Sequence, residues 1–305
     1  MDVSVLIVTY HAASYIEGCL NSVLMQENIS YEIIVVDNAS TDDTTVILKK
    51  MNDRICVIES AENLGFGKAN NLGFQQAKGD FVFLLNPDAK LVDSLALRRL
   101  IDFIRANPQV GIVGAKIIST QDAEKETLPK QYYPDEQNIN SPFQHLPGEV
   151  AWVLGASMLF PADVYRKLQG FDEAFFLYGE DADICLRARK LGYEIAYFPD
   201  VVVEHIGGAS EAAANFYDRT VRKEKAYHLF YTKHYGKDVA LHLARKKYWR
   251  SLWRLVEYRA LHLLMRRRAW HEKFLKNKAV CDIARQFEQS LLVEGETRCA
   301  CCRKK

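Results

Sequence analysis

The stretch FVFLLNPDAKL, residues 81–91, places five apolar residues directly before Asn86, Pro87 and Asp88. A run of this length is too short for an ordinary helix and predicts a buried strand at Phe81–Leu85. Proline has no N–H to donate to a sheet, so the strand is expected to end there. Asp88 would then project from the carboxyl end of the strand, which is the edge where open α/β sheets bind their ligands.

Similar short apolar runs occur at three earlier places, separated by segments with apolar residues at helical spacing. The expected strands are Val3–Thr9, 32–37 and 55–59, and the expected helices are 12–25, 42–51 and 67–77. This alternation predicts an α/β fold with a Rossmann-like, mostly parallel sheet flanked by helices. Thr9, Tyr10 and Asp37 end the first two strands and are expected near Asp88 at one ligand site.

Beyond a further strand near 111–117, the pattern becomes irregular. Residues 119–149 are polar and rich in proline, which favours a long surface loop or lid. We then expect ordered structure at 152–160, a helix at 180–191 that Gly192 ends, and a strand at 194–198.

Charge divides the chain into two parts of opposite sign. Residues 1–221 hold 18 Lys and Arg against 31 Asp and Glu, whereas residues 222–278 hold 17 basic and 4 acidic residues. The predicted organisation is an α/β domain at 1–215 with halves at 1–117 and 118–215, then a basic helical extension at 216–292 and a disordered tail at 293–305.

Composition and cysteine usage indicate the compartment. No apolar run approaches the ~18 residues of a membrane-spanning helix, and no signal peptide is expected. The seven cysteines are scattered rather than spaced as a disulfide framework, which favours reduced thiols and a cytoplasmic protein. The CACC group at 299–302 favours a tail with free thiols over a metal site or a lipid anchor.

Two carboxylates and a histidine at the strand ends are candidate ligand-binding groups. Asp88 suits a divalent cation, Mg²⁺ or Mn²⁺, bound also by a diphosphate, although an Asx turn after a strand would give the same pattern. Asp37 either binds a ribose or base edge or belongs to a helix cap. His205 follows a strand in VEHIGGAS and is either a ligand or a histidine satisfied by the structure.

Two further segments contain candidate phosphate-binding and catalytic groups. NLGFGKANN, residues 63–71, precedes a helix and brings Lys68 toward phosphate oxygens, but it is neither a P-loop nor the dinucleotide fingerprint of a dehydrogenase. Glu180, Asp181 and Asp183 crowd a predicted helix start. The helix dipole alone favours acids there, whereas mutual repulsion raises a pKa toward that of a general base.

The order of these motifs resembles glycosyltransferase family 2, and in particular its rhamnosyltransferase-like bacterial members that build surface polysaccharides. The resemblance covers roughly residues 3–210, and its motifs are VSVLIVTYH, EIIVVDNASTDDT, NLGFGKANNLG, GDFVFLLNPDAKL, GASMLFPADVYRKLQGFDEAFFLYGEDADICLRARKLGY and VEHIGGAS. It implies a GT-A fold, a nucleoside-diphosphate-sugar donor and inverting transfer to a hydroxyl of a glycan or lipid-linked glycan acceptor. By this resemblance, residues 1–215 would be the catalytic domain, with a nucleotide-sugar half at 1–117 and an acceptor half at 118–215.

Roles follow from the resemblance residue by residue. Thr9, Tyr10 and Asp37 would hold the nucleoside, and Lys68, Asn71 and Asn86 would lie near the donor. Asp88 and His205 would bind the metal. Asp181 would be the base, Glu180 and Asp183 would tune it or bind the acceptor, and Asp183 is the reserve candidate for the base. Two positions depart from the family pattern. Asn86 replaces the first aspartate of the DxD motif, and His11 stands where asparagine is usual.

Two alternatives remain beside this hypothesis. A sugar-nucleotide pyrophosphorylase would need a Gly-rich triphosphate loop after the first strand, and TYHAAS offers none. A non-catalytic nucleotide-sugar-binding or scaffold protein of the same fold would not need Asp37, Asp88 and Asp181 together.

The basic extension predicts a surface partner. Clusters of Arg and Lys at 245–278 alternate with Trp249, Trp253 and Trp270, which is typical of a helix on an anionic membrane surface. Packing against the acidic catalytic domain would also explain the charge. No known nucleic-acid-binding motif accompanies it, so nucleic acid is not an expected partner. The lipid-linked acceptor favours a peripheral location on the inner face of the cell membrane.

Overall fold

The computed structural model of the protein describes residues 1–120, 122–207, 215–265 and 268–302. The chain forms two compact units. The first consists of residues 1–133 and 143–210, and the second of residues 134–142 and 211–305. The sequence pattern assigned 134–142 to the catalytic domain, whereas this short segment packs with the C-terminal helices.

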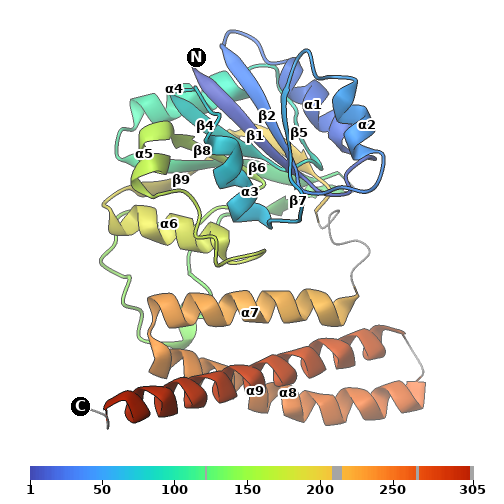
Figure 1. Ribbon diagram of the computed structural model, residues 1–305, viewed down its shortest axis with the longest axis vertical. Coiled ribbons are helices and arrows are strands. Elements are labelled where there is room, and N and C mark those ends of the chain that lie inside the picture. The colour runs from blue at the N-terminus through green and yellow to red at the C-terminus, as the bar shows by residue number, and fades with distance from the viewer. Residues whose placement is uncertain (121, 208–214, 266–267, 303–305) are drawn as a thin grey trace. The chain divides into compact units, whose positions relative to one another are not determined.

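The first unit is built on one sheet (Figure 1). Its strands are β1 (Val3–Thr9), β2 (Tyr31–Asp37), β3 (Cys56–Glu59), β4 (Phe81–Leu85), β5 (Ala89–Leu91), β6 (Val110–Ser119), β7 (Asp122–Thr127), β8 (Ser157–Pro161) and β9 (Glu194–His205). They follow the order β3-β2-β1-β4-β8-β6-β9-β5, with β7 beside β6. Strands β3, β2, β1 and β4 are parallel, which confirms the α/β prediction, and β8 begins a mixed half because it is antiparallel to both β4 and β6.

The turn at Asn86-Pro87-Asp88 makes the sheet curl. Strands β4 and β5 are separated by only these three residues, yet they lie four strand positions apart in the sheet. Four flat strand spacings would span ~19 Å, whereas the chain from Leu85 to Ala89 reaches ~14 Å at most. The sheet therefore bends so that β5 returns toward β4, and Asp88 lies inside the bend.

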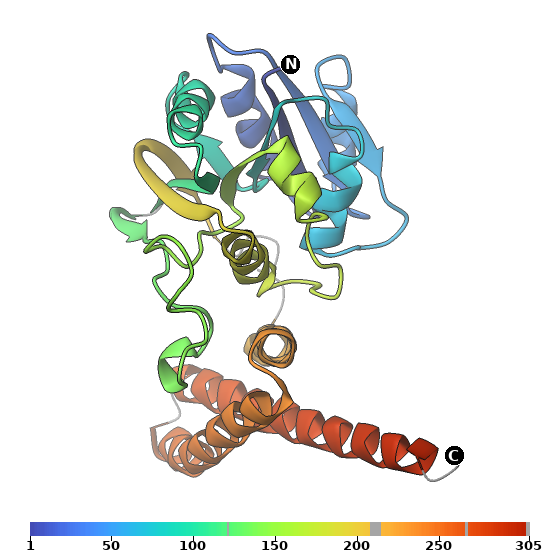
Figure 2. The same ribbon diagram turned by 90° about the vertical axis from the view of Figure 1, so that its left-hand side faces the viewer.

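Helices cover both faces of this sheet because successive strand residues point to opposite sides. The helices are α1 (Ile16–Leu24), α2 (Thr44–Lys49), α3 (Phe66–Phe74), α4 (Ala96–Ala106), α5 (Ala162–Lys167) and α6 (Glu180–Lys190). Helices α1, α2 and α4 share a core with Val5 and Ile7. Helices α3, α5 and α6 share the other core with Leu6 and Val82 (Figures 1 and 2).

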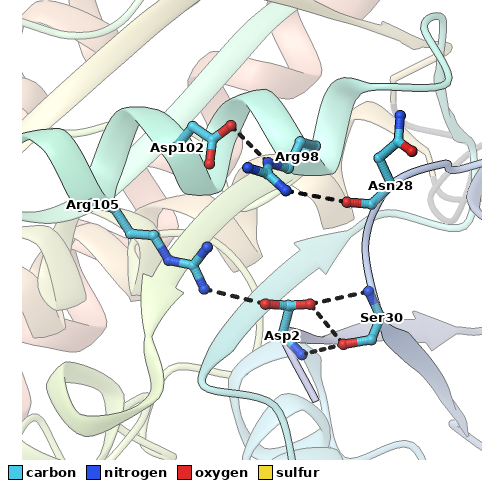
Figure 3. A network of polar contacts seen from close by, with 6 residues as sticks. All are labelled: Asp2, Asn28, Ser30, Arg98, Asp102 and Arg105. Atoms are coloured by element: carbon cyan, nitrogen blue, oxygen red, sulfur yellow. Dashed lines mark hydrogen bonds and ion pairs between the residues drawn. The ribbon is translucent and has the colours of Figure 1, made fainter.

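A polar network fixes the start of β1 to α4 (Figure 3). Asp2 Oδ1 accepts a hydrogen bond from Arg105 at 3.2 Å, and Asp2 Oδ2 accepts from the N–H and Oγ of Ser30 at 3.1 and 2.6 Å. On the same helix, Arg98 donates to the carbonyl oxygen of Asn28 at 3.4 Å. The hydrogen bonds of Ser30, aided by Arg105, lower the pKa of Asp2 to about 2.

The proline-rich segment that we expected to be a lid is held in place along much of its length. Strand β6 extends into it to Ser119, β7 follows, and Tyr133 and Phe143 are buried. Arg189 of α6 donates to three successive carbonyl oxygens, those of Leu146, Pro147 and Gly148, at 2.8 to 3.1 Å. The prediction missed this because the guanidinium that donates to these carbonyl oxygens lies some forty residues further along the chain.

The second unit consists of α7 (Phe216–His234), α8 (Lys237–Met265), α9 (Arg268–Cys302) and the short η1 helix (Glu136–Asn138). Tyr235 donates to the carbonyl oxygen of Pro134 at 2.8 Å, and Lys247 pairs with Asp135 at 3.0 Å, which holds the 134–142 segment to the helices. Helix α9 continues to Cys302, where the sequence pattern had predicted a disordered tail from residue 293, and residues 303–305 lie outside the described part. No helix within the described ranges is both long enough and apolar enough to cross a membrane.

Candidate active site

Thr9 and Asp37 form a pair of buried oxygens at the ends of neighbouring strands. They are register partners in the parallel pair β1 and β2, and they are 0% and 2% exposed. Thr9 Oγ1 and Asp37 Oδ1 have no hydrogen-bond partner among the described residues, while Asp37 Oδ2 accepts from the N–H of Ser40 at 3.2 Å. A buried polar atom without a partner costs about 1–3 kcal/mol, so such atoms are expected where a ligand completes the site.

The loops after β1 and β2 are strained next to this pair. His11 and Ala39 have φ angles of 51° and 64°, in the left-handed region that non-glycine residues seldom adopt. The N–H of His11 donates to Ser40 Oγ at 3.0 Å, and the imidazole stacks on Tyr10 with ring centroids 4.0 Å apart. Histidine tolerates this backbone better than most residues, as asparagine does, which is a physical reason why His11 can occupy the position.

Asn38 joins the end of β2 to the start of α3. Its amide donates to Asn63 Oδ1 at 2.9 Å and to the carbonyl oxygen of Gly65 at 3.1 Å, and its Oδ1 accepts from the N–H of Leu64 at 2.7 Å. The pattern 63–71 had drawn attention to Lys68 but not to Asn38. Lys68 is exposed in the first turn of α3.

Asn71 does not have the role expected from the sequence. Its Oδ1 accepts from Tyr165 Oη and from the N–H of Phe171, both at 2.9 Å, and its Nδ2 donates to the Phe171 carbonyl oxygen at 2.9 Å and to Glu173 at 3.3 Å. The amide group is therefore occupied in tying α3 to the segment after α5. We assign Asn71 a structural role instead of a contact with the donor.

Asp88, His205 and Asn86 meet inside the bend of the sheet. Asp88 is 7% exposed, and its Oδ1 lies 3.2 Å from His205 Nε2 while its Oδ2 accepts from the N–H of Gly207 at 3.1 Å. Asn86 Nδ2 lies 3.3 Å from the same His205 nitrogen. Burial raises the pKa of Asp88, but the hydrogen bond and charge of His205 and the Gly207 N–H outweigh it, so the net shift is downward.

This trio has the donor set of a hard cation that is completed by a substrate. Mg²⁺ and Mn²⁺ bind through one or two protein carboxylates together with phosphate oxygens and water. Asp88 offers a carboxylate, Asn86 an amide oxygen and His205 a ring nitrogen. In the described ranges no group of three or more His, Cys, Asp or Glu side chains gathers around one point, so a cation here would need oxygens from the donor.

The start of α6 carries the acidic cluster. Tyr178 and Gly179, with φ angles of 72° and 83°, form a left-handed turn directly before Glu180 and Asp181. A tyrosine in this conformation is costly, and such strain is concentrated at functional sites. The turn gives the two carboxylates different surroundings, since Glu180 is 4% exposed and Asp181 is half-buried.

Both carboxylates hold their protons more tightly than usual. Burial raises the pKa of Asp181 to about 6, against a small opposite effect of the Gly155 N–H. Burial and the charge of Asp181 raise the pKa of Glu180 well above its ordinary value. Glu180 Oε2 and Asp181 Oδ1 have no hydrogen-bond partner in the described part of the chain. Asp181 therefore has a pKa near the working range of a general base.

Asp183 differs from Glu180 and Asp181 because its carboxylate has a charged partner. It is fully buried, and its Oδ2 accepts from Arg187 Nε at 2.7 Å. Arg187 also donates to the carbonyl oxygens of Leu168 and Gly170, at 2.6 and 2.9 Å. A carboxylate held this way by a guanidinium is a poor proton acceptor, so this geometry favours an anchoring role for Asp183.

A continuous series of contacts links the three groups of residues. Asn38, next to Asp37, binds Gly65, and the neighbouring Phe66 ring would lie 3.0 Å from a β-carbon on Gly155. A β-carbon there would also lie 2.5 Å from Asp181 Oδ1. The next residue, Ala156, accepts from the Asn86 N–H at 3.2 Å, beside Asp88. Asp37, Asp88 and Asp181 thus lie around one edge of the sheet.

Gly155 and Phe66 were missed by sequence reasoning. The glycine inside WVLGASMLF was a signal for a close approach to the backbone, since glycine in a strand-like run often marks such a contact. Phe66 had no distinguishing pattern, because an aromatic residue in the first turn of a helix is usually part of the core.

Comparison with known proteins agrees with this geometry. The family model "Glycosyl transferase family 2" matches residues 4–168. The N-acetylglucosaminyl-diphospho-decaprenol L-rhamnosyltransferase of Mycobacterium tuberculosis is 25% identical over 230 residues, covering 66% of this chain and 75% of that protein. The O-antigen chain rhamnosyltransferase RfbN of Salmonella typhimurium is 23% identical over 210 residues, covering 67% of this chain and 66% of that protein.

The fold is also found in solved structures. Mannosyltransferase PcManGT from Pyrobaculum calidifontis, solved in complex with GDP-Man and Mn²⁺, superposes with a TM-score of 0.59 at 18% identity, covering 93% of this chain and 86% of that one. This likeness shows a shared GT-A fold. Together with the family match over more than half of the residues, it establishes that the chain belongs to glycosyl transferase family 2 and is a glycosyltransferase.

Proposed function

We propose that this glycosyltransferase moves a sugar, with inversion, from a nucleoside-diphosphate donor to a hydroxyl group of a lipid-linked glycan in the synthesis of a cell-surface polysaccharide. Rhamnose is the proposed sugar, because two relatives are named as rhamnosyltransferases. The observation that carries the proposal is the series of contacts that brings Asp37, Asp88 and Asp181 to one edge of the sheet.

Asp181 is the proposed base. Its unpartnered Oδ1 accepts the proton of the acceptor hydroxyl while that oxygen forms a bond to the anomeric carbon. The bond between the anomeric carbon and the phosphate oxygen breaks, and its electron pair leaves with the nucleoside diphosphate. Because attack and departure occur on opposite faces of the sugar, the configuration inverts. Burial and the charge of Asp181 favour the protonated form of Glu180, which limits the negative charge beside Asp181.

The proposed donor site uses the other two groups. The unpartnered Thr9 Oγ1 and Asp37 Oδ1 would bind the nucleoside, beside the stacked rings of Tyr10 and His11. Asp88, His205 and Asn86 would hold a divalent cation, and Lys68 would approach the phosphates. When bound, such a cation neutralises negative charge that develops on a departing diphosphate.

The second unit supports a membrane-associated acceptor. Trp249, Trp253 and Val256 of α8 are 66%, 79% and 71% exposed, and their spacing places them on one face of the helix. Exposed aromatic residues on a basic helix are typical of proteins that rest on an anionic membrane surface. We therefore propose that α8 contacts the inner face of the cell membrane, where a lipid-linked acceptor is available.

Ligand-dependent stabilisation tests the donor assignment. Thermal unfolding is measured with dTDP-, UDP- and GDP-sugars, each with and without Mn²⁺, because a ligand that binds only the native state raises Tm in proportion to its affinity. We expect one nucleotide class to raise Tm, with a larger rise in the presence of Mn²⁺. The Asp88→Asn variant should lose the Mn²⁺ increment. If no donor stabilises the parent protein, the proposed function is wrong.

Turnover separates the enzyme from a binding protein. A glycosyltransferase that binds its donor releases nucleoside diphosphate slowly by hydrolysis, and faster when an acceptor is present. Donor binding without any release of nucleoside diphosphate would favour the alternative of a non-catalytic scaffold. Flotation with neutral and anionic liposomes tests the membrane contact, since equal recovery with both would contradict an electrostatic attraction.

A further inference from the structure

Three helices of the second unit point polar and charged faces, rather than apolar ones, into a shared cavity of about 530 Å³. Each helix contributes four residues at positions i, i+3, i+4 and i+7, beginning at Thr220 of α7, Lys247 of α8 and Lys273 of α9, and α8 also contributes Tyr258 at i+11. This is the spacing of one helix face, and Pro134 and Asp135 complete the lining. A face that meets other helices is normally apolar, so this arrangement needs another explanation.

A network of ion pairs lies deep in the cavity. Lys247 is 9% exposed, and its ammonium group lies 3.0 Å from Asp135, 3.1 Å from Glu224 and 2.9 Å from Tyr231 Oη. Tyr231 also donates to Asp135. These two carboxylates exceed the buried cation by one negative charge, whereas five further cations line the cavity, so the lining as a whole is strongly positive.

Within the described ranges, most of the positive charge around the cavity is not balanced by an ion pair. Lys223, Arg250, Arg254, Lys273 and Lys276 are all exposed, and none of them forms an ion pair with a carboxylate in the described part of the chain. Lys223 and Lys273 instead lie over aromatic rings, 5.6 Å from Tyr227 and 4.4 Å from Trp270. Like charges converging on one cavity destabilise the helices unless an anion binds between them.

We infer that this cavity binds a phosphate-bearing anion of the size of a diphosphate. Arginine and lysine side chains from three directions suit phosphate oxygens, and the arginine fork binds two of them at once. Ser251 and Asn277, 4% and 8% exposed, add uncharged polar groups to the wall. The volume lies in the range of ~300–1,000 Å³ typical of ligand sites.

The cavity is separate from the exposed tryptophan face of α8. With ~100° per residue, the mean direction of Lys247, Arg250 and Arg254 lies about a third of a turn around the helix from that of Trp249, Trp253 and Val256. The anion site therefore does not depend on the proposed membrane contact. It does not depend on the donor site either, because all of its residues belong to the second unit.

Two triple variants with equal loss of charge test the site. Lys223→Gln/Arg254→Gln/Lys276→Gln removes one cavity cation from each helix. Lys225→Gln/Arg259→Gln/Lys278→Gln removes one exposed cation from each helix outside the cavity lining. Glutamine keeps helix propensity, and far-UV circular dichroism checks the fold. Binding of inorganic pyrophosphate is measured by calorimetry and by the rise in Tm.

The parent protein should bind pyrophosphate saturably, the cavity triple should bind it at least tenfold more weakly, and the control triple should stay within twofold of the parent. The cavity triple should also have the higher Tm without pyrophosphate, because repulsion is relieved. Equal losses in both triples, or no saturable binding by the parent, would overturn the site. Both triple variants keep Asp88, so the proposed donor site is tested separately. If that proposal is wrong, nucleotide sugars will not raise Tm, whatever the result with pyrophosphate.

The same proteins distinguish the source of the phosphate. Flotation uses phosphatidylcholine vesicles with and without phosphatidic acid, which carries a phosphomonoester. Binding that requires phosphatidic acid and is lost in the cavity triple identifies a lipid headgroup as the source. Pyrophosphate binding without any such dependence identifies a soluble phosphate. Either result supports the cavity as the phosphate site.

Discussion

Asp181 lies against the backbone of Gly155, so closely that a β-carbon on Gly155 would come within 2.5 Å of Asp181 Oδ1. The same β-carbon would meet the Phe66 ring at 3.0 Å. The absence of a side chain at residue 155 is therefore what leaves room for the carboxylate at the edge of the sheet. Gly155 is a positioning residue for the proposed base.

Gly155→Ala should lower kcat while leaving the dissociation constant of the donor nearly unchanged. The new methyl group must displace Asp181 or Phe66, and a shift of about 1 Å at a reacting group can cost about 100-fold in rate. Steady-state kinetics and donor titration measure the two quantities. Gly18→Ala is the control, because its β-carbon would meet only the flexible end of Lys90. Equal behaviour of the two variants would remove the positioning role.

Asp181→Asn should reduce transfer by about 100-fold to 10,000-fold, because an amide cannot accept the hydroxyl proton. Burial raises the pKa of Asp181 in the fold to about 6, above its ordinary value of 3.8, so stability is lost as the pH rises from about 4 to about 6. The variant should therefore have a higher Tm than the parent at pH 8 and nearly the same Tm at about pH 4. Asp53→Asn, at an exposed position, should change neither. Parental turnover in Asp181→Asn would exclude Asp181 as the base.

Glu180→Gln should keep most of the activity, since glutamine resembles the protonated acid that burial favours at this position. In the parent, kcat/KM should fall as the pH decreases through about 6, where Asp181 becomes protonated. Glu180→Gln should show the same decrease in kcat/KM as the pH falls through about 6. A loss as large as that of Asp181→Asn would identify Glu180 as the base instead.

Local patterns predicted the parallel half of the sheet well, because its strands are short apolar runs separated by helices. The register of β1 against β2 then brings Thr9 opposite Asp37 without any long-range information. The turn at Asn86-Pro87-Asp88 was predicted for the same reason, since proline ends a strand whatever lies around it.

The parts that the sequence did not predict depend on distant partners. Asn71 looked like a donor contact, but its amide binds Tyr165 and Phe171, about a hundred residues away in the chain. The 119–149 segment looked irregular, but Arg189 satisfies the carbonyl oxygens near its end. Side-chain hydrogen bonds of this kind have no periodicity, so no pattern in the sequence announces them.

Asp183→Asn should destabilise the fold by roughly 3 kcal/mol, because it leaves Arg187 without its buried partner. Urea unfolding measures the loss. Asp163→Asn breaks an ion pair of the same i, i+4 spacing whose carboxylate is 62% exposed, and it should cost less than about 1 kcal/mol. The folded Asp183→Asn protein should remain active, and its kcat/KM should decrease near pH 6 as in the parent. Loss of transfer at full stability would instead support Asp183 as the base.

Asp2→Asn should lower the urea midpoint at pH 7, and the difference from the parent should shrink as the pH falls from about 4 toward about 2. The pKa of Asp2, about 2, lies below its ordinary value of 3.8, so its hydrogen bonds with Ser30 and Arg105 stabilise the fold above pH 4 and are lost as the carboxyl is protonated. Asp102→Asn is the matched control, because Asp102 pairs with Arg98 at an exposed site on α4, the helix that carries Arg105 (Figure 3). This variant should change the urea midpoint little at any pH. A pH-independent difference for Asp2→Asn would mean that hydrogen bonds to either carboxyl form, rather than the charge of Asp2, fasten β1 to its neighbours.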